Sequence, residues 1–287
     1  MNAITIIGFN GGFGKLFFKH FAKENVTITG IDLQPKPAIN IANSAYIQAD
    51  ILALESDLIA NIKKANCIIF CVPEAALLQA YSNILTHLTP GTLVVDTLSV
   101  KTTISAMAEG QQDLEVLSLN PLFAPDLGFL GNNIAAVSFH GGSHTATFVA
   151  FLKKWGSVVS FLTAEQHDKL TAVIQVATHF SLLCFGSCLA QLDYKPDSAL
   201  FTPVHEVLLS LFGRMVSQNP EVYYKIQTDN PYGQQTREQF IASANNWNKA
   251  INSSYAESFK TEFLEANSVV AQVLETLTDN FINYQTK

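Results

Sequence analysis

The sequence predicts a doubly wound α/β domain built on a parallel sheet, followed by an all-helical domain. In the first half, short β-branched runs alternate with amphipathic segments, and these runs lack the polar alternation typical of a half-exposed strand. Beyond residue 163 the strand signal stops and only helical periodicity remains. A chain of 287 residues is long enough for two domains. We place these domains at residues 1–163 and 164–287.

Each element of the first half follows from its own pattern. Apolar, β-branched runs bounded by turn residues predict strands, and apolar residues at helical spacing predict the helices between them. The strands cover residues 3–8, 26–32, 46–48, 67–72, 93–96, 115–119, 134–139 and 158–162, and the helices cover 13–24, 55–64, 74–85, 102–108 and 143–154.

The second half reads as helices separated by turn residues. At Asn219 and Pro220 the asparagine is a helix cap and the proline fits the first helical turn. Apolar stripes such as Val204, Val207 and Leu211 indicate a core or a subunit interface, which is typical of a substrate domain that also dimerises. The helices cover residues 165–192, 203–217, 220–227, 234–251 and 254–283.

The composition is that of a globular chain without a nucleic-acid surface. Apolar residues make up 48% and charged residues 14%, well below the usual charged share of about 25%, which excludes an intrinsically disordered chain. The net charge of −7, with Arg214 and Arg237 as the only arginines, argues against a phosphate-binding surface for nucleic acid. The four cysteines lie in apolar surroundings, so we expect small buried side chains and no metal site.

One uncharged run, residues 170–192, is long enough to cross a bilayer. It carries several polar side chains and has no aromatic or basic flanks, so we expect a buried helix and no membrane partner. The N-terminus lacks the basic region of a signal peptide, and the expected location is the cytoplasm.

The first predicted strand ends in a glycine turn that opens a helix. Residues 8–14 read GFNGGFG, so Phe9 stands where a strict G-x-G-x-x-G has its first glycine. Gly11 allows close approach of a pyrophosphate, Gly14 lets the helix pack on the strand, and the helix N-terminus offers free N–H groups to phosphates. A structural turn without cofactor is the alternative. The expected dinucleotide-binding residues are Gly8, Phe9, Asn10, Gly11, Gly12, Phe13 and Gly14.

Asp32 strengthens the dinucleotide prediction. It ends the second predicted strand, where a carboxylate accepts hydrogen bonds from both ribose hydroxyls. The same charge repels a 2′-phosphate, so NAD is favoured over NADP as the cofactor. An ordinary turn residue after a strand is the alternative.

Three further stretches carry a family resemblance. They are residues 95–101 (VDTLSVK), residues 119–125 (LNPLFAP), and residues 165–168 (EQHD) leading to Gln175 and His179. Together with the glycine turn and the strand end at Cys71, Val72 and Pro73, they make the whole chain resemble prephenate dehydrogenase, most closely the enterobacterial type. The resemblance implies a Rossmann domain, a helical dimerisation domain and a homodimer formed through it. It also implies NAD-dependent oxidation and decarboxylation of prephenate, a dicarboxylate cyclohexadiene, to 4-hydroxyphenylpyruvate.

The resemblance also assigns roles to single residues. Ser99 would lie beside the nicotinamide and the substrate, His179 and Gln175 would bind the substrate, and Arg214 would grip a substrate carboxylate through its planar fork. Val72 and Pro73 would border the cofactor. The alternatives are a helix cap for Ser99, a core histidine for His179 and a surface arginine for Arg214.

Two titratable residues within these motifs, Lys101 and His167, are expected to have no catalytic role. His167 precedes an acidic residue at a predicted helix start, and we expect a structural role for it. For Lys101 we expect a solvated or phosphate-side charge and not a catalytic base.

Asn120 is the one departure from the family pattern. The family has a histidine there, which accepts a hydrogen bond from the substrate 4-hydroxyl as hydride leaves C4. An asparagine keeps an acceptor oxygen but takes up no proton. Three interpretations stay open: prephenate is oxidised with Asn120 as the acceptor, the substrate is the 4-amino analogue of prephenate, or the chain is an NAD-binding paralogue without catalysis. The predicted catalytic residues are therefore Asn120 and Ser99.

Overall fold

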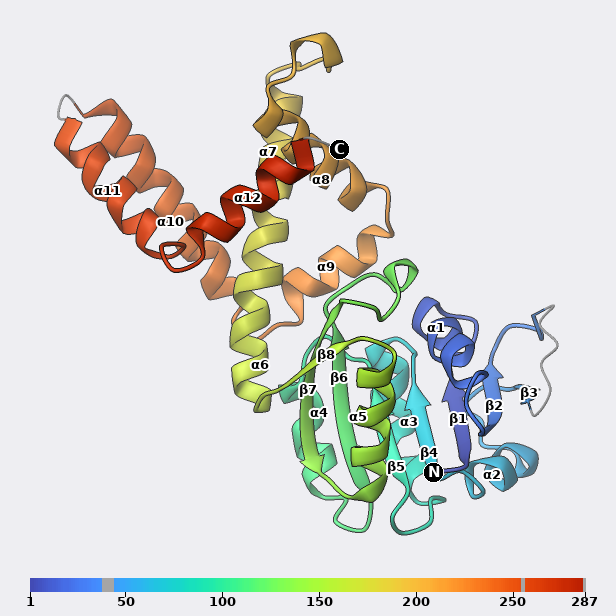
Figure 1. Ribbon diagram of the computed structural model, residues 1–287. Helices are drawn as coiled ribbons and strands as arrows, with labels where there is room; N and C mark the ends of the chain where they lie inside the picture. Colours follow the sequence, from blue (N-terminus) through green and yellow to red (C-terminus); the bar gives the residue numbers. More distant parts are fainter. Residues whose placement is uncertain (38–43, 254–255, 286–287) are drawn as a thin grey trace. The chain divides into compact units, whose positions relative to one another are not determined.

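The computed structural model describes residues 1–37, 44–253 and 256–285 (Figure 1). It divides into two compact units, Met1–Asp168 and Lys169–Lys287. The first unit is an α/β domain and the second is helical. The division expected between residues 163 and 164 stays a prediction; the helix that begins at Ala164 continues past Asp168, where the first compact unit ends.

The first unit is built on a sheet with strand order β3-β2-β1-β4-β5-β6-β7-β8. Every neighbouring pair is parallel except β6 and β7, which are antiparallel, so the predicted doubly wound parallel sheet is present with one antiparallel pair. No crossover helix separates these two strands, and an antiparallel pair needs none. The strands are β1 (Ala3–Ile7), β2 (Thr27–Asp32), β3 (Ser44–Gln48), β4 (Cys67–Phe70), β5 (Leu93–Asp96), β6 (Glu115–Pro121), β7 (Asn133–His140) and β8 (Val158–Phe161).

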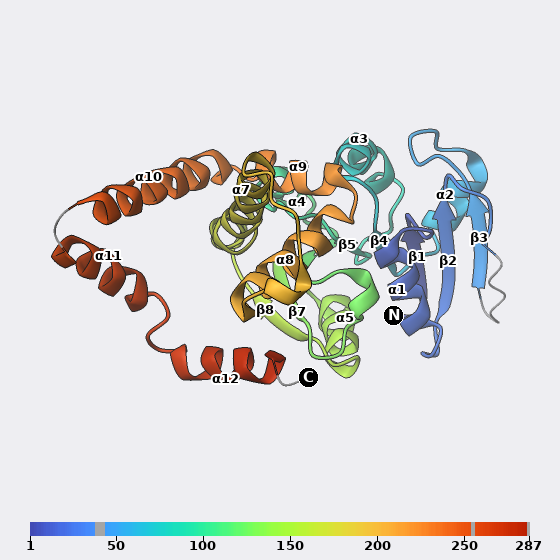
Figure 2. The same ribbon diagram turned by 90° about the horizontal axis from the view of Figure 1, so that it is seen from above.

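Helices cover both faces of the sheet (Figures 1 and 2). Leu16 and Phe17 of α1 share one apolar core with Phe148 of α5, whereas the other core contains side chains of α2, α3 and α4. This two-sided burial explains why a central strand such as β4 is apolar throughout. The helices are α1 (Gly12–Phe21), α2 (Ser56–Ile62), α3 (Glu74–Leu85), α4 (Thr102–Glu109) and α5 (Ser143–Lys154).

The strand order places the ligand crevice of the first unit. Between β1 and β4 the order of the strands reverses, and in doubly wound sheets ligands bind outside the carboxyl ends of the strands at that point. The ends of β1, β4, β5 and β6 carry, in turn, the glycine turn, Val72 and Pro73, the loop with Ser99, and Asn120. The predicted motifs of the first unit therefore share one edge of the sheet.

The second unit consists of helices among its described residues. The predicted helix over 254–283 is wrong as a single element, because the structure has two helices with a break at 269–273, where β-branched Val269 and Val270 lower helix propensity. Its predicted start at Ser254 lies outside the described residues. The helices are α6 (Ala164–Thr171), a π-helical segment (Ala172–Ala177), α7 (Thr178–Gln191), α8 (Pro203–Val216), α9 (Pro220–Thr228), α10 (Gly233–Asn252), α11 (Ala256–Ser268) and α12 (Leu274–Gln285).

The long apolar helix is less buried than its sequence predicts. Residues 164–191 form one continuous helical stretch with a mean hydropathy of 1.6, long and apolar enough to cross a membrane by length and composition only. In this chain 22% of that window is buried, so the expectation of a buried helix is wrong for the single chain. Cys184 and Cys188 on α7 are exposed for the same reason, whereas Cys67 in β4 is buried as expected.

Candidate functional site

The glycine turn between β1 and α1 is shaped by close backbone packing. Gly8 has φ +80°, a conformation that favours glycine, and a Cβ there would meet the carbonyl of Cys71 at the end of β4. A Cβ on Gly14 would meet the carbonyl of Gly8. Helix α1 then begins with Gly11 as its N-cap and with no acidic side chain in its first turn. Its free N–H groups are therefore available to an anion.

Phe9 departs from the strict motif because its side chain belongs to the core. The ring is 4% exposed and lies edge-on to Phe18 and Tyr46, with centroid distances of 4.7 and 5.6 Å. It also covers Gly30 of β2, where a Cβ would stand 2.7 Å from the ring atom Cγ. Only the backbone of Phe9 remains available to a cofactor.

A cavity of about 370 Å³ opens beside the turn. Asp32, at the end of β2, borders it: Oδ2 accepts from the Asn10 backbone N–H at 2.8 Å, and Oδ1 accepts from the Gln34 backbone N–H at 3.0 Å. Each carboxylate oxygen keeps a further lone pair for a hydroxyl group. The structure thus brings together in one cavity the predicted residues Gly8, Gly11, Asp32, Val72 and Pro73.

Asn120 lies at the carboxyl end of β6 and is 4% exposed. Its Nδ2 lies 3.0 Å from Nε2 of His167, and His167 Nδ1 lies 2.7 Å from Oδ1 of Asp168. His167 and Asp168 are fully buried on α6. Burial lowers the pKa of His167 from its ordinary value, although the bond to Asp168 opposes the shift. Burial thus favours the neutral form of His167.

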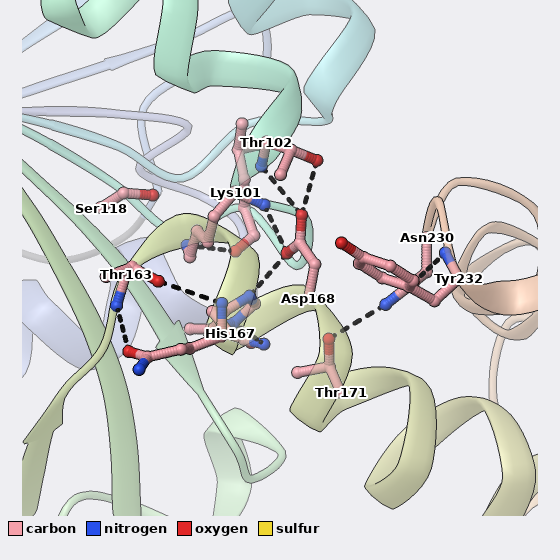
Figure 3. Close-up of polar contacts among 12 residues, drawn as sticks. Lys101, Thr102, Ser118, Thr163, His167, Asp168, Thr171, Asn230 and Tyr232 are labelled. Carbon is pink, nitrogen blue, oxygen red and sulfur yellow. Dashed lines mark hydrogen bonds and ion pairs between the residues drawn. The ribbon is translucent and has the colours of Figure 1, made fainter.

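Asp168 holds the start of α4 (Figure 3). Its Oδ1 accepts from the backbone N–H of Lys101 at 2.8 Å, and its Oδ2 accepts from the N–H and hydroxyl of Thr102 at 2.9 and 2.6 Å. Burial raises the pKa of Asp168, but the hydrogen bonds from His167, Thr102 and Lys101 outweigh burial and lower it. The N-terminus of α4 is thus capped by Asp168, and no cap hydrogen bond comes from Ser99, which is half-buried in the preceding loop.

Lys101 is fully buried, so the expectation of a solvated charge is wrong. Its Nζ donates to the carbonyls of Leu98 and Leu119 at 2.6 and 2.7 Å and lies 3.7 Å from Oδ1 of Asp96. Burial lowers the pKa of Lys101 to about 8, and Asp96 and Asp168 oppose this shift. The side chain ties the loop that carries Ser99 to the strand that carries Asn120.

The helical unit carries the other predicted substrate residues. Gln175 lies in the π-helical segment and His179 one turn later on α7, both half-buried. The His179 ring stands edge-on to Tyr223 with centroids 5.1 Å apart, and its Nδ1 is buried without a hydrogen-bond partner. Burial lowers the pKa of His179. Arg214 is exposed in the last turn of α8.

Sequence reasoning missed the part that His167 and Asp168 play in the site. Their adjacency at a helix start is visible in the sequence, but an acidic residue there is ordinarily the cap of its own helix. The available signal was a lysine, Lys101, a few residues after a buried apolar strand. A buried cation needs acceptors, and the carboxylates of Asp96, at the end of the preceding strand, and of Asp168, from a distant segment, lie near it.

Comparisons with known proteins identify similar sequences and a similar fold. Residues 163–265 match the family described as "Prephenate dehydrogenase, dimerization domain". The chain is 30% identical over 273 residues to a 4-amino-4-deoxyprephenate dehydrogenase of Streptomyces pristinaespiralis, covering 93% of this chain and 91% of that protein. It is 28% identical to a probable arogenate/prephenate dehydrogenase of Methanocaldococcus jannaschii, covering 92% of this chain and 60% of that protein. The crystal structure of Aquifex aeolicus prephenate dehydrogenase with hydroxyphenyl propionate and NAD+ is 16% identical, with a TM-score of 0.68 over 99% of this chain and 98% of that one.

Proposed function

The chain belongs to the prephenate dehydrogenase family, and we propose that it oxidises and decarboxylates a cyclohexadiene dicarboxylate bearing an amine at ring C4, with NAD+ as hydride acceptor. The observation that carries this proposal is Asn120, a buried amide where the family resemblance places a proton-accepting histidine. An amide oxygen accepts an N–H hydrogen bond without taking up a proton, whereas a protonated histidine repels an ammonium group. The name of the Streptomyces relative supports the same substrate class.

The glycine turn and Asp32 support NAD+ as the cofactor. The backbone at residues 8–14 is too close-packed for side chains at Gly8 and Gly14, and the open N-terminus of α1 suits a pyrophosphate. Asp32 suits the two ribose hydroxyls and disfavours a 2′-phosphate. When bound, NAD+ accepts the hydride that leaves ring C4. The similarly folded Aquifex enzyme was crystallised with NAD+.

The proposed reaction balances without loss of a proton from a neutral amine. The C4–H bond breaks and its electron pair leaves as hydride. The bond from C1 to the carboxylate breaks, its pair enters the ring, and carbon dioxide departs as the ring becomes aromatic. Positive charge develops at C4 and is shared by the nitrogen lone pair. Asn120 Oδ1, accepting from the amine N–H, orients that nitrogen and stabilises the charge.

The substrate carboxylates need cations and donors. We assign Arg214 to one carboxylate, because a guanidinium fork binds a carboxylate bidentately. His179 and Gln175 would bind the substrate from the helical domain, and Ser99 would lie beside the reacting carbon. These four assignments rest on the family resemblance, and the exposure of Arg214 leaves its guanidinium available.

A soluble cytoplasmic homodimer, joined through residues 164–287, is the proposed assembly. The family matched by residues 163–265 is described as a dimerization domain. Helices α7 and α8 expose apolar side chains, among them Leu183, Val204 and Leu211, that a second copy would cover.

Prephenate itself is the second candidate substrate. The Asn120 oxygen accepts from a hydroxyl as well as from an amine, and the Methanocaldococcus relative is named for arogenate and prephenate. An NAD-binding protein without catalysis is the third possibility.

The test follows NADH formation by the purified protein with NAD+ and equal concentrations of prephenate or 4-amino-4-deoxyprephenate. Faster turnover of the amine supports the proposal, and faster turnover of prephenate replaces the substrate. Thermal stabilisation by NAD+ without turnover of either compound identifies a binding protein.

A further inference from the structure

Three side chains of the first unit form a buried chain of hydrogen bonds. Asn120 at the end of β6 meets His167, and His167 meets Asp168, with distances of 3.0 and 2.7 Å. Among the described residues, none donates a hydrogen bond to Asn120 Oδ1. The amide nitrogen therefore faces His167, and the amide oxygen is left for another group.

The direction of each proton in this chain follows from Asp168. Its two oxygens accept hydrogen bonds from the Lys101 N–H, from the Thr102 N–H and hydroxyl, and from His167 Nδ1 (Figure 3). An ionised carboxylate only accepts, so the proton of the neutral imidazole lies on Nδ1. Nε2 then carries a lone pair and needs a donor. The Asn120 side chain can donate only through Nδ2. This requirement fixes the orientation of the Asn120 amide and the proton position on His167.

We propose that His167 and Asp168 are positioning residues that lock the Asn120 amide with its oxygen toward the C4 substituent of the substrate. The inference rests on the proposed function, because it assumes that Asn120 faces that substituent. A freely rotating amide would present its NH₂ group part of the time, and that group repels an amine N–H. The lock therefore makes position 120 a permanent acceptor and selects a donor on the substrate.

The lock depends on a neutral imidazole. The charged groups that act on the pKa of His167 include Asp168 on its own helix, and Lys101 and Asp96 from the loop after β5 and from β5 itself. Below the lowered pKa of His167 both ring nitrogens carry protons. Nε2 then donates, the Asn120 amide turns its oxygen toward His167, and the acceptor is lost to the substrate. Turnover should therefore fall in acid as His167 takes up its second proton.

The first test reads the proton position directly. Protein labelled with ¹⁵N in histidine is studied by long-range proton–nitrogen correlation at pH 7.5, and His167 is assigned by the signal missing from His167→Gln. The proposal requires the Nδ1–H form in the protein without substrate. An Nε2–H form or an imidazolium overturns it.

The second test distinguishes the hydrogen bonds of the His167 side chain from the space that it fills. Gln at position 167 keeps one donor and one acceptor on its terminal amide, whereas Leu keeps neither. We expect His167→Gln to keep kcat for the amine within about threefold, and His167→Leu to lose about 10- to 100-fold, the loss expected for an unsatisfied buried group. KM for NAD+ should stay unchanged in both. His20→Gln, in the aromatic cluster of α1, is the matched control and should change neither.

The pH profile supplies the result that a merely structural histidine would not give. The acid limb of kcat should be present in the unmodified protein and absent in His167→Gln, since glutamine does not titrate. The same limb in both proteins overturns the proposal. If the unmodified protein does not oxidise the amine, the proposed function fails, and the NMR measurement still decides the proton positions.

Discussion

Nδ2 of Asn120 lies 3.0 Å from Nε2 of His167, which joins the end of β6 to the start of α6, 47 positions along the chain. A histidine is therefore still present at this site, behind the position that the family resemblance gives to a catalytic histidine. Because His167 is fully buried, it can orient the Asn120 amide but cannot itself replace Asn120 as the acceptor for the substrate. This arrangement suits a substrate that needs a fixed acceptor more than a base.

Asp32 should decide the choice of cofactor. Replacing it with serine removes the charge that repels a 2′-phosphate and the second ribose acceptor. We expect KM for NAD+ to rise about 10- to 100-fold for Asp32→Ser, with measurable use of NADP+. Asp57→Asn, an exposed acidic residue on α2, is the control. Unchanged kinetics with both cofactors would remove Asp32 from the nucleotide site.

Phe9 should prove structural despite its place in the motif. Phe9→Gly writes a strict G-x-G-x-x-G but leaves a cavity over Gly30 and beside Phe18. We expect the free energy of unfolding to fall by about 3–5 kcal/mol, measured by urea denaturation. Phe9→Leu, which keeps much of the apolar volume, should lose less. Equal stability of Phe9→Gly and the unmodified protein would contradict the packing account.

Lys101 should contribute to stability through its buried contacts. Lys101→Met removes the donor to two carbonyls and the cation 3.7 Å from Asp96, and breaking a buried ion pair from one side costs about 3–5 kcal/mol. Thermal unfolding of the variant, with exposed Lys154→Met as control, measures this loss. An unchanged transition would mean that the lysine stabilises nothing.

The same variant has a pH signature. The folded protein releases the Lys101 proton near pH 8, whereas the unfolded chain holds it until about pH 10.4. Between these values the unfolded state binds more protons, so folding stability from this group rises with pH. The stability difference between the unmodified protein and Lys101→Met should therefore widen from pH 8 to pH 10. A constant difference would contradict the lowered pKa of Lys101.

Arg214 should act in substrate binding. Arg214→Lys keeps the charge but loses the bidentate fork, so KM for the dicarboxylate should rise about tenfold or more with a smaller change in kcat. Arg237→Lys is the natural control, because Arg237 bonds the Gln227 carbonyl within the helical unit. Equal effects of the two substitutions would argue against the assignment.

The sequence predicts the elements of the first unit well, because a sheet covered on both faces leaves continuous apolar runs such as Ile68–Phe70 and clear helix periodicity between them. It does not predict the antiparallel β7, since a run such as 134–139 looks the same in either direction. The pattern of apolar residues also does not predict the break in the helix after Ser268.

Within the site, motifs predict the glycine turn, Asp32 and Asn120, whose chemistry is local. The environments of Lys101, His167 and Asp168 depend on contacts between α6 and the ends of β5 and β6. A local sequence pattern does not predict such contacts between distant segments. Phe9 shows the same limit in reverse. Its position in the motif indicates a ligand contact, whereas its ring lies in the core.

The central claim is that Asn120 selects an amine at ring C4, and one paired measurement tests it. The kcat/KM values for 4-amino-4-deoxyprephenate and prephenate are determined for the unmodified protein and for Asn120→His, with NAD+ as cofactor. Because a positioned acid–base group contributes about 10²- to 10⁴-fold, we predict that Asn120→His gains prephenate turnover on that scale and loses turnover of the amine. The same substrate preference in both proteins would contradict the account.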